Sequence, residues 1–299
     1  MVMHLDEAAI REVLHWEPLI AAMEAALAAF SAGRVLQPVR NMLTIEEGKR
    51  YLGIMPAVAE AAMGLKLVSF YPGNAERGLP THMAMVLLFR PDTGEPLAVM
   101  DGRLITEMRT AAVSAAATRH LAAPEAHVLA LLGSGVQAAA HLEALRLVRP
   151  IDEVRVWSRT PEHAKRFAEQ HGASAVDAET AVRGADIIVT ATNALQPILR
   201  GVWLKPGAHV NAVGSPRPTW RELDDEAMAN VLVVDSREAV LKESGDVILA
   251  GASIHAELGE IFTGTKAVPA GATTVFKSVG LAVEDIAAAK LVYDALTDR

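Results

Sequence analysis

The chain has 299 residues, a formal net charge of -8 and no cysteine. The acidic balance excludes nucleic acid as a general partner, because phosphate binding needs a basic face. The lack of cysteine excludes disulfides, thiol nucleophiles and thiolate metal centres together, and it fits a reducing cytoplasm. Apolar residues make up 51% of the chain, which predicts a well-buried core. The length allows roughly two domains, or one large one.

No segment is predicted to enter a membrane. The apolar stretches are far shorter than the ~20 residues that a span requires. The first ten residues include Asp6 and Glu7, where a signal peptide needs a basic and then an apolar stretch.

The first third of the chain is predicted to be a mixed α+β domain. Asp6 is a candidate cap for a short helix through Leu14. Apolar residues at helical spacing predict a second helix over 17–32. Strands are predicted at 38–45, 51–57, 63–70, 82–89 and 96–100, and a further helix from 104 or 105 to about 121.

The pattern changes after Pro124, where short apolar strands alternate with amphipathic helices. Such alternation is typical of a parallel sheet covered on both faces. Strands are predicted at 127–132, 153–157, 186–190, 209–213 and 231–234, helices at 136–148, 161–171 and 281–296, and a loop at 264–274. The predicted fold class is therefore α/β, with a Rossmann-type doubly wound parallel sheet over 119–279 and an α+β domain formed by 1–118 and 280–299.

A glycine-rich turn follows the first strand of the predicted parallel sheet. The residues Gly133-Ser134-Gly135-Val136-Gln137-Ala138 match G-x-G-x-x-A between a strand and a helix. The first glycine permits the tight turn, the second lets the backbone approach a pyrophosphate, and the alanine allows close helix packing. The free N–H groups of the helix N-terminus then face the phosphates. The sequence therefore predicts a dinucleotide site that includes Gly133, Gly135, Val136 and Gln137.

The end of the next strand indicates which dinucleotide binds. An NAD site usually has an acidic residue there to accept the ribose hydroxyls. Here Ser158-Arg159-Thr160 follows the strand, with His163 one helical turn further on. Arg159 is suited to pair with a 2′-phosphate, and the hydroxyls are suited to donate to it. We therefore expect NADPH, with NADH as the alternative cofactor.

Small and polar residues follow two later strands. Thr192 and Asn193 end one of them, and Val213 and Ser215 end the next. Ligands bind at the carboxyl ends of strands in open α/β sheets, so these residues are candidates for the nicotinamide site. Each of them alone fits close packing equally well.

Three cations stand in otherwise apolar stretches of the first domain: Arg40, Lys66 and Arg109. A charged residue in a buried strand or helix must be paired. A bound substrate carboxylate would pair all three, with arginine as the bidentate partner and lysine as a point charge. Lys66 is also a candidate proton donor if burial lowers its pKa. Each cation alone would fit a solvated surface, and the three together favour an anion pocket.

Thr81 and His82 lead into a predicted strand. The histidine is suited to contact the cofactor or to relay a proton, or to stand simply at the start of its strand. No group of His, Asp and Glu has metal-ligand spacing, so no metal is expected. The G-x-S-x-G and P-loop motifs of hydrolases and triphosphatases are missing from the sequence.

These residues together resemble the ornithine cyclodeaminase/mu-crystallin family over nearly the whole chain. The stretch from residue 211 onward resembles the ketimine reductase branch more than the cyclodeaminases. The resemblance is carried by residues 64–66, 70–74, 98–102, 109–112, 133–137, 211–214, 221–224, 242–246, 257–260, 274–278 and 283–285.

The resemblance implies a homodimer whose first domain supplies the interface and binds the substrate beside the nicotinamide. It implies carboxylate binding by Arg40, Lys66 and Arg109, with Lys66 and Arg109 as the catalytic residues. The complete predicted cofactor-binding set is Thr81, His82, Thr110, Gly133, Gly135, Val136, Gln137, Ser158, Arg159, Thr160, His163, Thr192, Asn193, Val213, Ser215 and Ser278.

One position departs from the cyclodeaminase pattern. Cyclodeaminases carry an aspartate shortly after the Asn-Ala-Val-Gly strand, aimed at the substrate amine, and here Pro216 stands there. The expected activity is therefore NADPH-dependent reduction of a cyclic imino carboxylate, in amino-acid metabolism. The alternatives are an NAD-dependent ornithine cyclodeaminase or alanine dehydrogenase, and a non-catalytic protein that binds NADPH and an aromatic acid.

Overall fold

The structure is a computed structural model that describes residues 2–297, except for the side chain of Ala75. The chain divides into two compact units, Met1–Arg109 with Leu281–Arg299 and Thr110–Gly280. Helix α3 (Gly102–Leu121) begins in the first unit and continues into the second. Among the described residues, no single helix is long and apolar enough to cross a membrane; only α1 and α2 taken together, bent by 91°, reach that length and composition.

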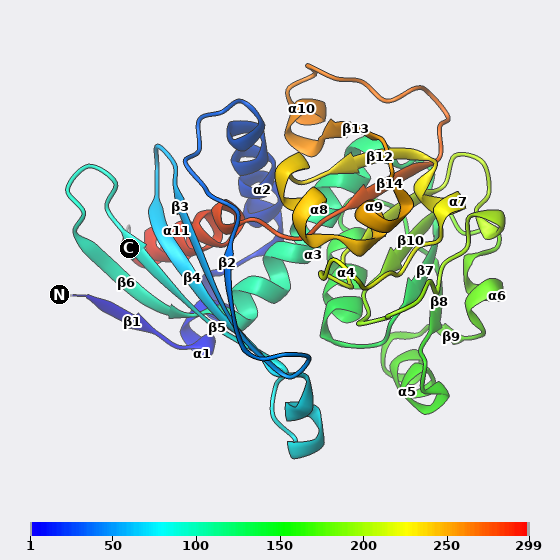
Figure 1. Ribbon diagram of the computed structural model, residues 1–299, viewed down its shortest axis with the longest axis horizontal. Coiled ribbons are helices and arrows are strands. Elements are labelled where there is room, and N and C mark those ends of the chain that lie inside the picture. Colours follow the sequence, from blue (N-terminus) through cyan, green and yellow to red (C-terminus); the bar gives the residue numbers. More distant parts are fainter. Residues whose placement is uncertain (1, 298–299) are drawn as a thin grey trace. The chain divides into compact units, whose positions relative to one another are not determined.

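The first unit is built on a six-stranded sheet in the order β1-β6-β5-β4-β3-β2, which Figure 1 shows in blue to cyan-green. Strands β2 to β6 pair antiparallel with their neighbours, and β1 joins β6 in parallel. The strands are β1 (Met3–Leu5), β2 (Asn41–Glu46), β3 (Arg50–Val58), β4 (Met63–Phe70), β5 (His82–Phe89) and β6 (Pro96–Asp101). The other elements are α1 (Glu7–Val13), α2 (Trp16–Ser31), the 3-10 helix η1 (Pro72–Arg77) and α11 (Ala282–Thr297).

The two faces of this sheet differ. Helix α11 covers one face, where it contacts β3, β4 and β5, and α2 packs against α11 in turn. Alternate residues of the strands point to that face and are buried, among them Met55 and Val86. The opposite face presents exposed apolar side chains, including Leu43, Met83 and Met85. We refer to it as the open face.

The second unit is an eight-stranded, wholly parallel sheet in the order β13-β12-β14-β11-β10-β7-β8-β9. The chain runs outward from β7 to β9 and then returns to β10 on the other side of β7, so the strand order reverses beside β7. Such a switch point is where doubly wound sheets bind their ligands. The strands are β7 (Val128–Leu132), β8 (Glu153–Trp157), β9 (Ser174–Ala175), β10 (Ile187–Thr190), β11 (His209–Ala212), β12 (Val231–Val234), β13 (Ile254–Glu257) and β14 (Thr274–Lys277).

Helices on both faces of this sheet complete the doubly wound arrangement, and the predicted α/β fold class is confirmed (Figure 1). They are α4 (Val136–Arg146), α5 (Pro161–His171), α6 (Ala178–Val182), η2 (Gly201–Trp203), α7 (Asp225–Met228), α8 (Arg237–Glu243), α9 (Gly245–Ala250) and α10 (Leu258–Phe262).

Several predicted bounds were wrong for identifiable reasons. Strand β2 starts at Asn41 and not at Pro38, because proline has no N–H to give to a ladder. Helix α3 starts at Gly102, earlier than predicted, since Asp101 accepts a hydrogen bond from the N–H of Arg103 at its first turn. Strand β14 was missed because Thr274 and Lys277 give its four residues a mixed polar pattern.

Candidate active site

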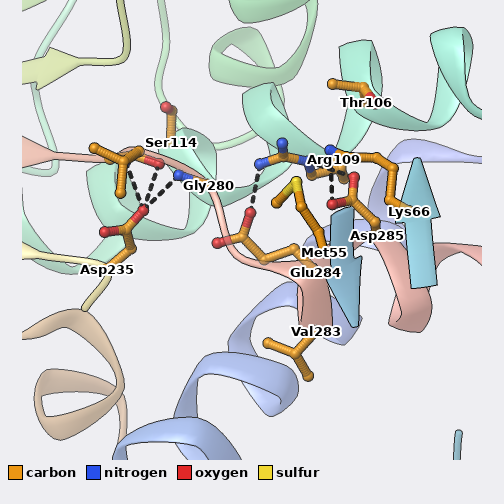
Figure 2. Close-up of polar contacts among 12 residues, drawn as sticks. Met55, Lys66, Thr106, Arg109, Ser114, Asp235, Gly280, Val283, Glu284 and Asp285 are labelled. Atoms are coloured by element: carbon orange, nitrogen blue, oxygen red, sulfur yellow. Dashed lines mark hydrogen bonds and ion pairs between the residues drawn. The ribbon is translucent and has the colours of Figure 1, made fainter. Parts of the chain in front are cut away.

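A buried ion cluster lies on the covered face of the first unit's sheet. Lys66 on β4 is 2% exposed and stands between its cross-strand neighbours Met55 and Val86. Its Nζ lies 2.8 Å from Oδ2 of Asp285 in the first turn of α11. Arg109 of α3 donates its Nε to Oδ1 of the same aspartate at 3.0 Å. Asp285 therefore bridges both cations, as Figure 2 shows.

Glu284 supplies the second carboxylate of this cluster. Its Oε2 lies 2.5 Å from Nη1 of Arg109, and its side chain is wholly buried. The sequence predicts that a substrate carboxylate pairs Lys66 and Arg109, but the chain itself pairs both of them. Lys66, Arg109 and Arg40 are three cations, and Asp285 and Glu284 are two carboxylates. Together these five groups have a net charge of one positive unit when all are ionised. That charge matches a single carboxylate ligand.

Arg40 differs from the other two predicted cations. It precedes β2 instead of lying inside a strand, and it is half-buried. Its Nη1 lies 3.8 Å from Sδ of Met55. It is close enough to Lys66 that its charge lowers the pKa of that lysine. The structure therefore keeps Arg40 beside the cluster on its more accessible side.

The cluster shifts the protonation of its members. Burial lowers the pKa of Lys66 to about 8, and the charges of Arg109 and Arg40 act in the same direction while Asp285 opposes them. Burial would raise the pKa of Asp285, but Arg109 and Lys66 outweigh it and hold that pKa below its usual value. Lys66 is thus a buried ammonium that can release a proton near neutral pH, as a general acid requires.

The glycine-rich turn of the second unit fits a pyrophosphate. Gly133 has φ +124°, and a Cβ there would lie 2.7 Å from the carbonyl oxygen of Ala191. Gly135 precedes α4 without any side-chain cap, and a Cβ there would meet nothing within 4 Å. The first N–H groups of α4, from Val136 and Gln137, are therefore open to an anion on the β7 side of the switch point.

The residues after β8 fit an adenosine 2′-phosphate. Arg159, Thr160 and His163 are exposed, and Ser158 is half-buried. Thr160 is the N-cap residue of α5, yet its side chain makes no capping hydrogen bond. A hydroxyl, a guanidinium and the N-terminus of α5 thus follow directly on the end of β8, where an NAD site would have an acidic residue; the nearest one in sequence, Glu162, lies in the first turn of α5.

The predicted nicotinamide-side hydroxyls have protein partners. Thr192 Oγ1 donates to Oε1 of Glu222 at 2.7 Å, and Ser278 Oγ donates to Oδ2 of Asp235 at 3.0 Å. Ser215 Oγ donates to the carbonyl of Ala194 at 2.7 Å, with its backbone at φ +49°. These hydroxyls already bond to neighbouring loops. We therefore expect these residues to serve the cofactor through their backbone and their small size. Asn193 is exposed and Val213 is half-buried at the same strand ends.

A buried charge network that the sequence analysis missed holds those strand ends together. Glu222 accepts hydrogen bonds from Thr190 Oγ1, from the N–H and hydroxyl of Thr192, and from the N–H of Gly214. Burial raises the pKa of Glu222. A Cβ on Gly214 would lie 2.3 Å from Oε1 of Glu222, so only glycine fits there.

Lys277 closes this network from β14. Its Nζ donates to the carbonyl of Gly214 at 2.7 Å and lies 2.9 Å from Oδ2 of Asp246. Asp246 Oδ1 in turn accepts the backbone N–H groups of Glu222 and Leu223. The sequence signal for this network was Lys277 in a mainly apolar stretch, the same signal that singled out Lys66, whereas Glu222 and Asp246 stand among other charged residues and gave no such signal.

The remaining predicted residues lie outside these clusters. Thr81 and His82 stand at the start of β5, with Thr81 Oγ1 3.2 Å from His82 Nδ1 and the imidazole packed 4.4 Å from the Phe70 ring. Thr110 is the first residue of the second unit, within α3. Their part in cofactor binding stays a prediction. Over residues 2–297, no group of three His, Asp or Glu side chains is arranged to hold a metal ion.

The doubly wound sheet, its glycine-rich turn and the open helix N-terminus define a dinucleotide-binding protein. The model of the ornithine cyclodeaminase/mu-crystallin family matches residues 2–299, and the chain belongs to this family. The predicted family is thereby confirmed.

Named relatives agree with this membership. The chain is 54% identical over 286 residues to the ketimine reductase mu-crystallin of Rattus norvegicus, covering 93% of this chain and 91% of that protein. It is 42% identical over 309 residues to a Δ1-pyrroline-2-carboxylate reductase of Bacillus cereus, covering 97% and 95%. The solved Δ1-pyrroline-2-carboxylate reductase of Thermococcus litoralis, in complex with NADH and L-proline, is 37% identical with a TM-score of 0.94, covering 99% and 98%.

Proposed function

We propose that the protein is an NADPH-dependent reductase of cyclic ketimine carboxylates. Δ1-Pyrroline-2-carboxylate and Δ1-piperideine-2-carboxylate are the substrates, and proline and pipecolate are the products. The observation that carries the proposal is the buried Lys66–Arg109 cluster, which has one net positive charge when the neighbouring Arg40 is included, in a chain whose close relatives reduce imines.

The first unit binds the substrate carboxylate. Arg109 has Nε and Nη1 turned to Asp285 and Glu284, which leaves Nη2 to donate to a ligand. Lys66 adds a point charge, and Arg40 reaches the cluster from its half-buried position. Because the Arg109 guanidinium and the Lys66 ammonium are already held by α11, they lose little conformational freedom on binding.

The second unit binds the dinucleotide through the turn at Gly133 and Gly135. A bound nicotinamide supplies the hydride that the imine carbon accepts. Reduction of C=N also consumes one proton, and Lys66 delivers it to the ring nitrogen from its ammonium form. The lysine is then recharged from solvent.

Pro216 argues for reduction over cyclising deamination. Proline at this position, where cyclodeaminases have an aspartate, offers no carboxylate to deprotonate and hold the side-chain amine of ornithine. An imine substrate already has its ring closed and needs no such group. Ornithine is therefore expected to be a poor substrate.

The NADPH preference rests on Arg159. In the variant Arg159→Ala, the KM for NADPH is expected to rise about 10- to 100-fold, while the KM for NADH changes less than about threefold, because only the 2′-phosphate loses a charge-assisted partner. Steady-state kinetics with both cofactors measures the effect. Arg166→Ala, at an exposed arginine of the following helix α5, is the matched control. An equal rise for both cofactors would contradict the assignment.

The open face is where a second copy of the chain docks. Cross-strand neighbours build it, with Met83 opposite Ser69 and Met85 opposite Leu67, and Leu43, Met83 and Met85 are 46%, 43% and 49% exposed. A two-fold dimer would cover it with itself, and an archaeal alanine dehydrogenase of 33% identity is described as a dimer. We place this homodimer in the cytoplasm, which suits a chain without cysteine.

The variant Met85→Lys tests the dimer. Its new ammonium stands opposite Asp101 on β6, which favours the fold, but an interface between two copies would take this charge out of water and incur its desolvation penalty. Light scattering is expected to give twice 31.8 kDa for the wild type and 31.8 kDa for the variant. Leu249→Lys, at an exposed residue of α9, serves as the control. A wild-type monomer, or a variant that dimerises as well as the wild type, would argue against this interface.

The activity itself is tested by following NADPH absorbance with each imine, with NADH and a blank without imine alongside. Rapid, imine-dependent oxidation that prefers NADPH is expected. Tight NADPH binding without turnover on either imine would contradict the proposal and favour a binding role.

A further inference from the structure

Asp285 stands apart from the other groups around Lys66. It is the one carboxylate in the described part of the chain that contacts the Lys66 ammonium, at 2.8 Å. Its second oxygen accepts Nε of Arg109 at 3.0 Å. It is wholly buried in the first turn of α11, with no solvent to take over either contact. One side chain therefore orients both cations.

We propose that Asp285 is a positioning residue for the reaction: its bridge keeps Lys66 as the protonated ammonium that delivers the proton. This inference rests on the proposed imine reduction and assigns the group that maintains its acid. Asp285 itself does not contact the reacting atoms, and its effect passes through Lys66.

The surroundings of Lys66 explain why such a group is needed. Burial lowers the pKa of Lys66 to about 8, and neighbouring cations lower it as well, whereas Asp285 alone among the principal contributors raises it. Without this carboxylate the lysine would be neutral over much of the physiological range. The groups that face Lys66 are Asp285 from α11, Arg109 from α3, Arg40 from the segment before β2, and the apolar Met55 and Val86 from the flanking strands. Glu284 of α11 contacts Arg109.

The same carboxylate has an opposite effect on substrate binding. Its negative charge stands beside the cations that receive the substrate carboxylate, so it weakens their attraction for an anion. The variant Asp285→Asn keeps the side-chain volume and removes that charge. It is therefore expected to leave KM for the imine unchanged or lower, while the proton supply fails. A residue with a purely structural role would raise KM and lower kcat together.

The pH dependence of kcat is the decisive measurement. A general acid must be protonated, so activity falls as pH rises through the pKa of Lys66. We call this fall the alkaline limb of the pH profile. In Asp285→Asn the limb is expected to lie about 1 to 2 pH units lower, since an opposite charge at this distance changes a pKa by about that amount. Above the limb, kcat of the variant is then about 10- to 100-fold below that of the wild type, and on the acid plateau it stays near the wild-type value. The substrate's own protonation contributes equally to both profiles.

Three further variants sharpen the comparison. Asp285→Glu restores the charge and is expected to bring the limb back toward the wild-type pH. Glu284→Gln loosens Arg109, so it raises KM and moves the limb less than Asp285→Asn does. Asp294→Asn, on the exposed part of the same helix where Asp294 pairs with Lys290, leaves the profile unchanged. Superimposable profiles of wild type and Asp285→Asn, or a lower kcat with a raised KM at every pH, would overturn the inference.

A titration without turnover separates this inference from the proposed function. The lysine ¹³Cε signals are followed by NMR against pH, and the Lys66 signal is assigned by its loss in Lys66→Met. We expect a pKa of about 8 in the wild type and a lower one in Asp285→Asn. A wild type that reduces no imine would contradict the proposed function alone. An unchanged Lys66 titration in Asp285→Asn would contradict the role of Asp285 alone.

Discussion

Replacing Lys66 by methionine is expected to lower kcat for imine reduction by about 10²- to 10³-fold, within the range that general acids contribute. Methionine preserves most of the side-chain length on the covered face of the sheet, between Met55 and Val86. Asp285 keeps Arg109 as a partner in this variant, so the first unit is expected to fold. Loss of the lysine charge also raises KM for the imino carboxylate, by about tenfold.

Steady-state kinetics with a saturating cofactor measures both parameters of Lys66→Met. Lys49→Met removes an exposed lysine of the same unit, paired with Glu46, and is expected to leave kcat and KM within about twofold of the wild type. Normal turnover with normal substrate affinity in Lys66→Met would remove the lysine from both of its assigned roles.

Replacing Lys277 by methionine is expected to destabilise the second unit by about 3–5 kcal/mol, the usual effect of breaking a buried ion pair. The ammonium is wholly buried, contacts Asp246 and donates to the carbonyl of Gly214. Its removal leaves Asp246 and Glu222 buried without a cation, and the loop at Gly214 loses its anchor. Cofactor affinity is expected to fall as well, because these strand ends form the nicotinamide side of the proposed site.

Denaturant unfolding measures this loss, followed by a signal of the second unit such as Trp157 or Trp220 fluorescence. Lys242→Met is the matched control, because Lys242 forms an exposed pair with Glu238. It is expected to stay within about 0.5 kcal/mol of the wild type. A Lys277→Met variant as stable as this control would show that the buried network does not contribute to the free energy of unfolding.

The parts of the fold that sequence could predict are those with a local signal. Strands β4, β5, β8 and β12 and helix α5 have the bounds that periodicity predicts, because their apolar pattern is uninterrupted. The turn at Gly133 was also predictable, since its glycines stand between a strand and a helix. Strand β14 was not, because Thr274 and Lys277 interrupt the apolar pattern of its four residues.

The candidate site was likewise predictable only where a residue has a local sequence signal. Lys66 and Arg109 are conspicuous as cations in apolar stretches, and the structure brings them to one cluster. Their partners Glu284 and Asp285 lie more than 170 residues away from Arg109 in the chain, so no local spacing links them. The pairing of Glu222 with Thr190, Thr192 and Gly214 depends in the same manner on which strands become neighbours.

In the proposed reaction, hydride passes from the nicotinamide to the imine carbon of a cyclic imino carboxylate. The most direct test of this transfer is to incubate the protein with Δ1-pyrroline-2-carboxylate and NADPH deuterated on either face of C4, and to analyse the product by mass spectrometry and NMR. We predict proline that carries one deuterium, at the carbon bearing the carboxylate, from one of the two labelled cofactors only. Deuterium elsewhere, or NADPH oxidation without labelled proline, would contradict the account.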